Sequence, residues 1–515
     1  MNSNFKNYFY KKFTMPAKND LIEIIKEGYN TKGDYITLGA AMFDDETLTN
    51  SFVKIPLKTI NRHGLIAGAT GTGKTKTLQV FAENLSENGI PVLLMDVKGD
   101  LSGLAKPSSG HKKIEERHAL IGLPFTPKSF PVEILTISEQ KGIRLRATVS
   151  EFGPTLLSRI LELSEVQSGI MAVLFQYCDD NDLPLLDLKD FKKVLQYATQ
   201  EGKKELEKDY GRISSSSTGS ILRKIVALEQ QGGELFFGER SFEVGDLTRI
   251  ADDGRGVISI LRLTDIQDKP KLFSTFMLQL LAEIYSTFPE QGDSDRPELV
   301  LFIDEAHLVF ENASKPLLDQ IESIIKLIRS KGVGIYFVTQ NPKDIPSDIL
   351  SQLGLKVQHA LRAFTAKDRK AIKLAAENYP DSPFYKTDEV LTELGIGEAL
   401  VSALSEKGIP TPLAKTMMRA PMSRMGILEE KELKELLGLS KMAGKYNEEV
   451  DRESAYEILN EKISAIKSIK KEREQKKRTS SSSRSSSVNP LIKLVTSATF
   501  IRGIFGILNK VLIKK

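Results

Sequence analysis

Residues 63–80 read HGLIAGATGTGKTKTLQV, and Gly68 to Thr75 within them fit the pattern G-x-x-x-x-G-K-[ST] without a gap. The glycines of this loop permit backbone conformations closed to other residues, so that successive N–H groups can converge on phosphate oxygens. The apolar run before the loop predicts a buried strand, and the segment after it predicts a helix whose N-terminal end points at the same phosphates. The stretch therefore predicts a nucleotide-binding loop in an α/β domain.

This loop and the start of its helix supply most of the expected nucleotide contacts. Lys74 can reach the β- and γ-phosphates, and the Thr75 hydroxyl can hold Mg²⁺. The alternative is a Gly/Thr-rich loop that fits the pattern by chance, which the strand before it and the helix after it disfavour. The expected binding residues are Gly68, Ala69, Thr70, Gly71, Thr72, Gly73, Lys74, Thr75 and Thr77.

A second motif lies at residues 298–305, which read ELVLFIDE. An apolar strand that ends in two adjacent carboxylates is the Walker B pattern. Asp304 is expected to hold Mg²⁺ through its waters, and Glu305 to act on the attacking water as a general base or positioning group. One acid after a buried strand would be a weak signal, but two acids in a chain with a complete phosphate loop are a strong one.

Two other predicted strands end in polar side chains. Residues 91–96 end in Asp96, and residues 334–340 end in Gln340. Ligands collect at the carboxyl ends of strands in parallel sheets, so we expect both side chains near the nucleotide. The Gln340 amide could contact the γ-phosphate and the water, as a catalytic residue. The alternative is that each is an ordinary polar residue at a strand end.

The composition of the 515-residue chain, with 40% apolar and 27% charged residues, is typical of a globular protein, and the length suggests two to four domains. The one cysteine, Cys178, excludes an internal disulfide framework. The first fourteen residues lack the apolar segment and cleavage site of a signal peptide. These features predict a cytoplasmic protein.

Positive charge is concentrated towards the C-terminus. Residues 461–515 hold 14 Lys/Arg and 3 Asp/Glu, so residues 1–460 carry a net charge of −7 in a chain whose total is +4. We expect a Ser-rich linker at 479–490, followed at 491–515 by a basic amphipathic helix too interrupted by charge to span a bilayer. That helix could pack on its own protein or a partner, lie on a membrane surface, or bind nucleic acid, and the first use is slightly favoured.

Several segments together resemble the HerA-like P-loop ATPases, in particular their YjgR group within the HerA/FtsK class. The resemblance implies a RecA-like core with a helical insertion that assembles as a hexameric ring and uses ATP. Relatives in the wider class move DNA or protein through the ring. Better-understood HerA translocases carry a larger barrel where this chain has about 60 residues before the loop. The resemblance covers roughly residues 30–425 and is carried by NRHGLIAG and its loop (61–75), DVKGDLSG (96–103), FIDEAH (302–307), VTQNP (338–342), QHALRAF (358–364) and GEALVS (397–402).

Two arginines are candidates for a charge-stabilising role, because ring ATPases commonly take an arginine from the neighbouring subunit to stabilise the γ-phosphate. Arg329, near the end of a predicted helix at 317–331, is the first candidate, acting in trans. Arg362, just past the following strand, is the second, as a finger or as a sensor in cis. For both, the alternative is an ordinary helix-end or surface arginine.

The expected organisation is a P-loop NTPase core with additions at both ends. Helical periodicity from about 150 to 240 predicts a helical insertion within the core. The fold class is α/β, a RecA-like core with a short N-terminal β segment and a helical or disordered C-terminal tail. The expected parts are a small β lead-in at 1–60, the ATPase core at 61–425, a charged helical region at 426–478, the linker and the C-terminal helix.

These features predict an ATP-hydrolysing, ring-forming motor with ATP and Mg²⁺ as cofactors and a homo-hexamer as its assembled state. DNA is a partner by family analogy alone, since the chain has no Trp and its main body no basic–aromatic pattern that would mark a groove for single strands. The alternative is a nucleotide-dependent scaffold or membrane-associated assembly ATPase, peripheral at the membrane. A small-molecule kinase comes third, because Glu305 beside Asp304 suits water activation.

Overall fold

A twelve-stranded sheet runs through the first part of the chain. The computed structural model describes residues 18–265, 268–292, 294–310, 315–448, 450 and 452–479. The chain divides into two compact units, Met1–Tyr456 and Glu457–Lys515, and the sheet belongs to the first. Of the second unit the structure describes most of α19 (Ala455–Thr479).

The described residues contain no helix that is both long and apolar enough to cross a bilayer. Nearly all of the expected linker at 479–490 and the whole expected helix at 491–515 lie outside the described residues. The predictions for the C-terminal tail therefore stay predictions.

The sheet is parallel over most of its width and antiparallel at one end. The eight neighbouring strands from β10 to β6 are parallel, and the other four continue the sheet in antiparallel pairs. Across the sheet the strands are β2 (Glu46–Pro56), β1 (Tyr35–Phe43), β12 (Ala414–Met418), β11 (Glu398–Ser402), β10 (Leu355–Gln358), β3 (Gly64–Ala67), β9 (Val333–Thr339), β8 (Leu299–Ile303), β4 (Val92–Asp96), β7 (Ile258–Arg262), β5 (Val132–Thr136) and β6 (Ile143–Arg144).

The strands that lead to the expected site are apolar runs. β3, β9, β8 and β4 are buried along their whole length, as parallel strands with both faces covered must be. β9 pairs with β3 on one side and with β8 on the other, and β4 pairs with β8. Their carboxyl ends therefore meet at one edge of the sheet, called here the carboxyl edge. The opposite edge is the amino edge.

Helices between the strands complete the α/β class predicted from the sequence, which is confirmed. The P-loop helix α3 (Lys74–Glu87) follows β3, α11 (Pro270–Thr287) precedes β8, and α13 (Lys315–Ile328) precedes β9. Shorter helical segments and connections fill the rest of the core. They are α2 (Lys18–Gly28), η1 (Leu57–Arg62), η2 (Ser102–Ala105), α4 (Lys112–Ile121), η3 (Val244–Thr248), α12 (His307–Phe310), η4 (Arg329–Lys331), η5 (Pro342–Asp344), α14 (Ser347–Leu350), α15 (Ala366–Ala376) and α16 (Thr387–Glu393).

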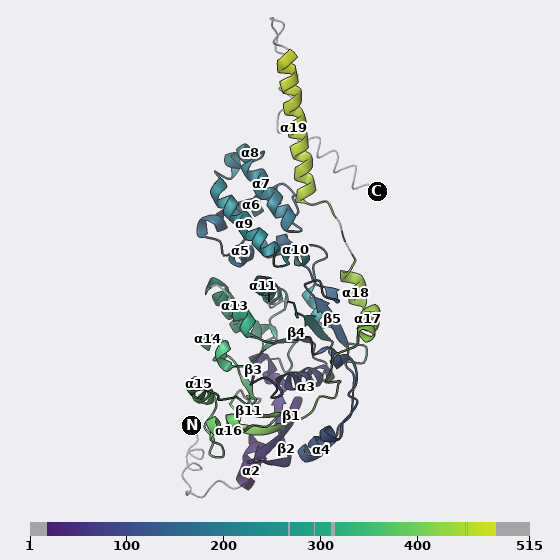
Figure 1. Cartoon of the computed structure of the whole chain (residues 1–515), viewed down its shortest axis with the longest axis vertical. Helices are drawn as coiled ribbons and strands as arrows, with labels where there is room; N and C mark the ends of the chain where they lie inside the picture. The colour runs from purple at the N-terminus through teal and green to yellow at the C-terminus, as the bar shows by residue number, and fades with distance from the viewer. Residues whose placement is uncertain are drawn as a thin grey trace. The chain divides into compact units, whose positions relative to one another are not determined.

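The helical insertion of the predicted fold class is present in the core, and its helices lie near the expected residues 150–240. Three of its helices begin with capping boxes, at Thr148, Ser164 and Asp187, whose side chains accept a backbone N–H while the residue three positions later bonds back to the cap. In Figure 1 the insertion gathers at one end of the first unit, away from the β1–β2 hairpin. It lies between β6 and β7 and comprises α5 (Val149–Ile160), α6 (Glu165–Asp180), α7 (Leu188–Thr199), α8 (Lys203–Asp209), α9 (Ser215–Glu229) and α10 (Gly233–Phe236).

The N-terminal β segment forms the antiparallel end of the sheet. β1 and β2 pair as a hairpin, and β1 also pairs with β12. β12, β11 and β10 therefore separate the hairpin from β3, although η1 connects β2 to β3 along the chain. Tyr29, directly after α2, connects this N-terminal part to the core by hydrogen bonds. Its hydroxyl donates to the carbonyl oxygens of Val401 (3.1 Å) and Pro412 (2.7 Å).

The chain after β12 runs along α3, and we call residues 419–428 the strap. Buried Glu83 on α3 accepts hydrogen bonds from the backbone N–H groups of Met422 (2.8 Å) and Ser423 (2.9 Å). Lys76 on the same helix donates to the carbonyl of Met425 (2.6 Å). Beyond the strap, α17 (Glu430–Leu439) packs against β5 and α18 (Lys441–Tyr446) against β6. The first unit thus continues past residue 425, the expected end of the ATPase core.

Candidate nucleotide site

The phosphate loop connects the carboxyl end of β3 to the first turn of α3. Gly73 is the N-cap of α3 and has left-handed backbone torsions, with φ of 119°. A Cβ on Gly68 would lie 2.6 Å from the Cβ of His359, closer than two such atoms can approach. Glycine is therefore required at Gly68 by packing and at Gly73 by backbone conformation.

Neighbouring segments hold the loop in place. The backbone N–H of Ala69 donates to the carbonyl of Ala360 (2.8 Å), just past β10. The N–H of Gly397, just before β11, donates to the carbonyl of Thr72 (3.0 Å). The loop is thus fixed by the two segments that follow β10 and precede β11.

Lys74 is folded back over its own loop. Its Nζ donates to the carbonyl oxygens of Gly68 (2.6 Å) and Ala69 (3.1 Å), and the side chain is buried. Burial and the charge of Lys98 lower the pKa of Lys74, while the charges of Glu305 and Asp304 act in the opposite direction. The ammonium group therefore lies in the field of the Walker B acids.

The Walker B acids follow β8 at the carboxyl edge, and Lys98 contacts both of them. Lys98 Nζ lies 2.6 Å from Glu305 Oε1 and 3.7 Å from Asp304 Oδ2. Both carboxylates are buried, and Glu305 has a left-handed backbone conformation with φ of 48°. His307 Nδ1 lies 3.3 Å from Glu305 Oε2, but this oxygen has no hydrogen-bond partner among the described residues.

The pKa values of the two acids are shifted in opposite directions. Burial raises the pKa of Asp304 to about 6, against the opposing charge of Lys98. Burial also acts to raise the pKa of Glu305, but the hydrogen bond and charge of Lys98 outweigh it and hold that pKa below its usual range. Glu305 is thus ionised near neutral pH and can accept a proton or a hydrogen bond.

The donor set fits the expected Mg²⁺ and nucleotide. A hydroxyl at Thr75 and a carboxylate at Asp304 are the hard oxygen ligands that Mg²⁺ prefers. The loop offers backbone N–H groups at the start of a helix of more than three turns, which suits a phosphate. The buried Oε2 of Glu305 is an acceptor without a hydrogen-bond partner in the described part of the chain.

Two residues of the expected nucleotide set are engaged elsewhere in this structure. Asp96 accepts hydrogen bonds from the N–H groups of Gly99 (2.7 Å), Asp100 (3.2 Å) and Leu101 (3.2 Å), and burial raises its pKa to about 6. Asp96 thus shapes the turn that carries Lys98. Thr77 is buried on α3, and its hydroxyl is hydrogen-bonded to His359 Nε2 (2.9 Å) beneath the loop.

Gln340 and Arg362 lie at the carboxyl edge with the phosphate loop. Gln340 follows β9, which lies between β3 and β8, and its Oε1 is 3.4 Å from the hydroxyl of Thr70. Arg362 is exposed and follows Ala360, the residue that binds the loop backbone. The structure therefore places both residues after strands that end at the same edge as the loop and the Walker B acids.

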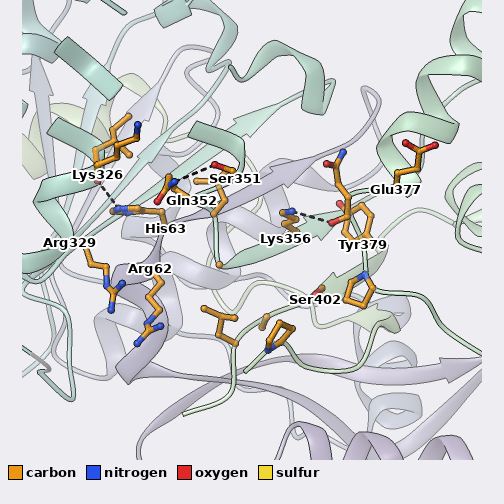
Figure 2. Close-up of a pocket in the computed structure, with 18 residues that line it drawn as sticks. Arg62, His63, Lys326, Arg329, Ser351, Gln352, Lys356, Glu377, Tyr379 and Ser402 are labelled. Carbon is orange, nitrogen blue, oxygen red and sulfur yellow. Dashed lines mark hydrogen bonds between the residues drawn. The ribbon is translucent and has the colours of Figure 1, made fainter. Parts of the chain in front are cut away.

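Arg329 lies at the amino edge, away from the phosphate loop of its own chain. It begins η4, just before β9, and lines a cavity of about 470 Å³ together with Arg62 and His63 (Figure 2). His63 donates through Nε2–H to the carbonyl of Ile325 (3.0 Å) and accepts from the N–H of Ile335 through Nδ1 (3.0 Å). These two bonds assign the proton to Nε2, since the other nitrogen is the acceptor.

Lys98 is the site residue for which sequence reasoning assigned no role. The pairing of β4 with β8 places Met95 opposite Ile303, so the residues after each strand face each other. The signal was available in DVKGD at 96–100, where a lysine follows the strand end by two residues. The contact of this lysine with the Walker B acids could not be predicted without knowing that β4 and β8 are neighbours.

Comparison with known proteins agrees with this architecture. The chain is 26% identical over 392 residues to the DNA double-strand break repair helicase HerA of Saccharolobus solfataricus, covering 75% of this chain and 69% of that one. It is 24% identical over 430 residues to the probable helicase MJECL08 of Methanocaldococcus jannaschii, covering 76% and 74%. The plasmid coupling protein TrwB bound to a non-hydrolysable ATP analogue has a similar fold, with a TM-score of 0.51 at 15% identity over 79% of this chain and 95% of that one.

The match to a family is broader than any of these pairwise similarities. Residues 43–502 match the family described as Helicase HerA-like C-terminal. That range includes the phosphate loop, the Walker B acids and every strand of the parallel part of the sheet. The chain belongs to the HerA-like helicase family.

Proposed function

We propose that this protein hydrolyses ATP with Mg²⁺ and works as a ring-forming motor on DNA. The observation that carries the proposal is the buried Glu305 at the same sheet edge as the loop lysine Lys74: Lys98 holds its pKa below the usual range, and its Oε2 has no hydrogen-bond partner among the described residues. A carboxylate so placed is suited to accept a proton from water. The same feature disfavours a small-molecule kinase, whose site excludes water.

Each residue has a defined task in the proposed reaction. The N–H groups of the loop bind the phosphates, and Lys74 leaves the carbonyls of Gly68 and Ala69 to contact the β- and γ-oxygens. Thr75 and Asp304 would hold Mg²⁺, which neutralises charge on those oxygens. Glu305 orients the attacking water and accepts its proton, and the Gln340 amide contacts the water or the γ-phosphate.

The position of Arg329 supports a role between subunits. An arginine at the amino edge cannot serve the loop at the carboxyl edge of its own chain, but it can reach the loop of a neighbour in a closed ring. Arg362, at the carboxyl edge, suits a sensor in cis. The homo-hexamer remains part of the proposal, as does DNA, which is named in the description of the S. solfataricus relative.

The test of the function is steady-state ATPase activity with and without duplex DNA. Full-length protein is assayed at about 50 mM and about 200 mM salt, because contacts with DNA phosphates weaken steeply over this range. We expect Mg²⁺-dependent turnover that DNA stimulates more at low salt. Turnover that persists in EDTA would contradict the metal role, and indifference to every DNA would contradict the motor.

A nucleotide-dependent scaffold is the second candidate function, and the uneven distribution of charge along the chain supports it. Residues 1–460 carry a net charge of −7, and positive charge is concentrated in residues 461–515. In that case ATP closes the ring and the tail recruits a partner or a membrane surface. Deletion of residues 491–515 would then leave DNA-independent ATPase activity unchanged but abolish assembly or partner binding.

A further inference from the structure

Lys98 reaches the Walker B acids from a turn that is itself tightly built. The two oxygens of Asp96 accept the N–H groups of Gly99, Asp100 and Leu101, so the backbone on either side of Lys98 is fixed. Gly99 has φ of 73°, and a Cβ there would lie 2.7 Å from Cγ2 of Thr264. The turn therefore presents Lys98 in one direction, towards β8.

The contact divides the two oxygens of Glu305 into different roles. Oε1 is taken by the Lys98 ammonium group at 2.6 Å, the distance of a strong charge-assisted hydrogen bond. Oε2 is buried and lies 3.3 Å from Nδ1 of His307, but it has no hydrogen-bond partner among the described residues. A carboxylate held by one oxygen keeps the other in a defined place, because rotation of the group would break the first bond.

The contact with Asp304 is of another kind. At 3.7 Å it is an ion pair beyond hydrogen-bond distance, so it is more readily exchanged than the bond to Glu305. Asp304 is also the carboxylate expected to hold Mg²⁺. A cation that binds Asp304 must therefore compete with Lys98 for it.

We propose that Lys98 is a positioning residue for the hydrolysis of ATP. It holds Oε1 of Glu305 so that Oε2 faces the attacking water, and it releases Asp304 to Mg²⁺ when the nucleotide binds. The inference rests on the proposed ATPase function and adds to it a residue that touches the catalytic carboxylate.

The first test is the kinetics of Lys98→Met, which keeps the length of the side chain and removes its charge. We expect kcat to fall about tenfold or more, while KM for ATP changes less than about threefold, because the water-orienting acid is disturbed and the phosphate loop is not. Lys98→Arg, which restores a cation, should recover part of the loss. The control is Lys141→Met, which removes an exposed lysine paired with Glu430 and should change neither parameter.

A double variant separates positioning from a general effect on structure. In a Glu305→Gln background, Lys98→Met should lower kcat no further, because the carboxylate that the lysine positions is gone. Two losses that multiply would overturn the proposal, as would a Lys98→Met protein with kcat within about twofold of the wild type.

A binding measurement tests, without relying on hydrolysis, whether Mg²⁺ replaces Lys98 at Asp304. Binding of ADP is followed while Mg²⁺ is titrated, for wild type and Lys98→Met. We expect half-saturation at an Mg²⁺ concentration at least about threefold lower in the variant, because the competing cation has been removed. An unchanged or higher Mg²⁺ concentration at half-saturation would overturn the proposal that Mg²⁺ displaces Lys98 from Asp304. A wild-type protein that binds Mg²⁺ and ADP but never hydrolyses ATP would instead refute the proposed function, and this titration would still decide the exchange.

Discussion

The surroundings of Glu305 make this one residue suited to accept a proton from water. It is buried and left-handed in its backbone, Lys98 lowers its pKa, and among the described residues only its Oε1 has a hydrogen-bond partner. We expect Glu305→Gln to bind ATP and Mg²⁺ normally and to lose turnover by about 100-fold or more, because the water loses its proton acceptor while the phosphate loop is intact. Lys74→Ala should instead weaken nucleotide binding itself. A Glu305→Gln protein with wild-type turnover would contradict the assignment of the water-activating group.

The phosphate loop gives a second prediction at the scale of one residue. Gly68→Ala places a methyl group 2.6 Å from the Cβ of His359 and forces a positive φ on alanine. We expect reduced nucleotide affinity and a loss of about 1–3 kcal/mol in the free energy of unfolding, measured with urea. Gly169→Ala is the matched control: Gly169 is exposed on α6 with open space around it, and alanine there should be neutral or stabilising. Equal effects of the two changes would contradict this account.

At the scale of elements, the strap depends on one buried acid of α3. Glu83 accepts two backbone hydrogen bonds and one from the hydroxyl of Ser423, and burial raises its pKa. Glu83→Gln turns one acceptor atom into a donor opposite other donors, and we expect the free energy of unfolding to fall by about 1.5–3 kcal/mol. Glu87→Gln, one turn later in α3, removes a carboxylate that pairs with Lys128 at the surface and should cost less than about 1 kcal/mol. Chemical denaturation of both variants provides the comparison.

Local sequence patterns predicted individual helices and strands but not how the strands are ordered in the sheet. The local patterns predicted β3, α3, β8 and β9, because an apolar run between polar ends is visible within a few residues. Strand order was not visible, because it depends on pairings between segments hundreds of residues apart. The ion pair of Lys98 with Glu305 and the engagement of Asp96 in its own turn both follow from that order and from local backbone geometry. The hydrogen bond between Thr77 and His359 could not be predicted for the same reason.

At the scale of the whole molecule, the separation of Arg329 from the phosphate loop leads to a mixing experiment. Arg329→Ala and Lys74→Ala proteins should each be nearly inactive alone, and they should regain part of the ATPase activity when co-assembled. Mixed rings contain seams that pair an intact loop with an intact arginine. Lys326→Ala is the control, since Lys326 lines the same cavity and pairs with Glu322 on its own helix. No recovery in demonstrably mixed rings would refute the role in trans, and a fully active monomer would refute the ring.

The short length of β3 has a mechanical consequence for such an assembly. His63, which contacts the helix and strand around Arg329, and Gly68, which opens the phosphate loop, are separated only by Gly64–Ala67. That distance is about 13 Å of extended chain, fully buried and hydrogen-bonded to β9 and β10 on its two sides. A strand held on both sides resists stretching, so a shift of His63 along the strand would move Gly68 with it. In the proposed ring, a displacement at Arg329 would therefore be passed along β3 to the phosphate loop of the same chain, so that hydrolysis at one seam would affect the next.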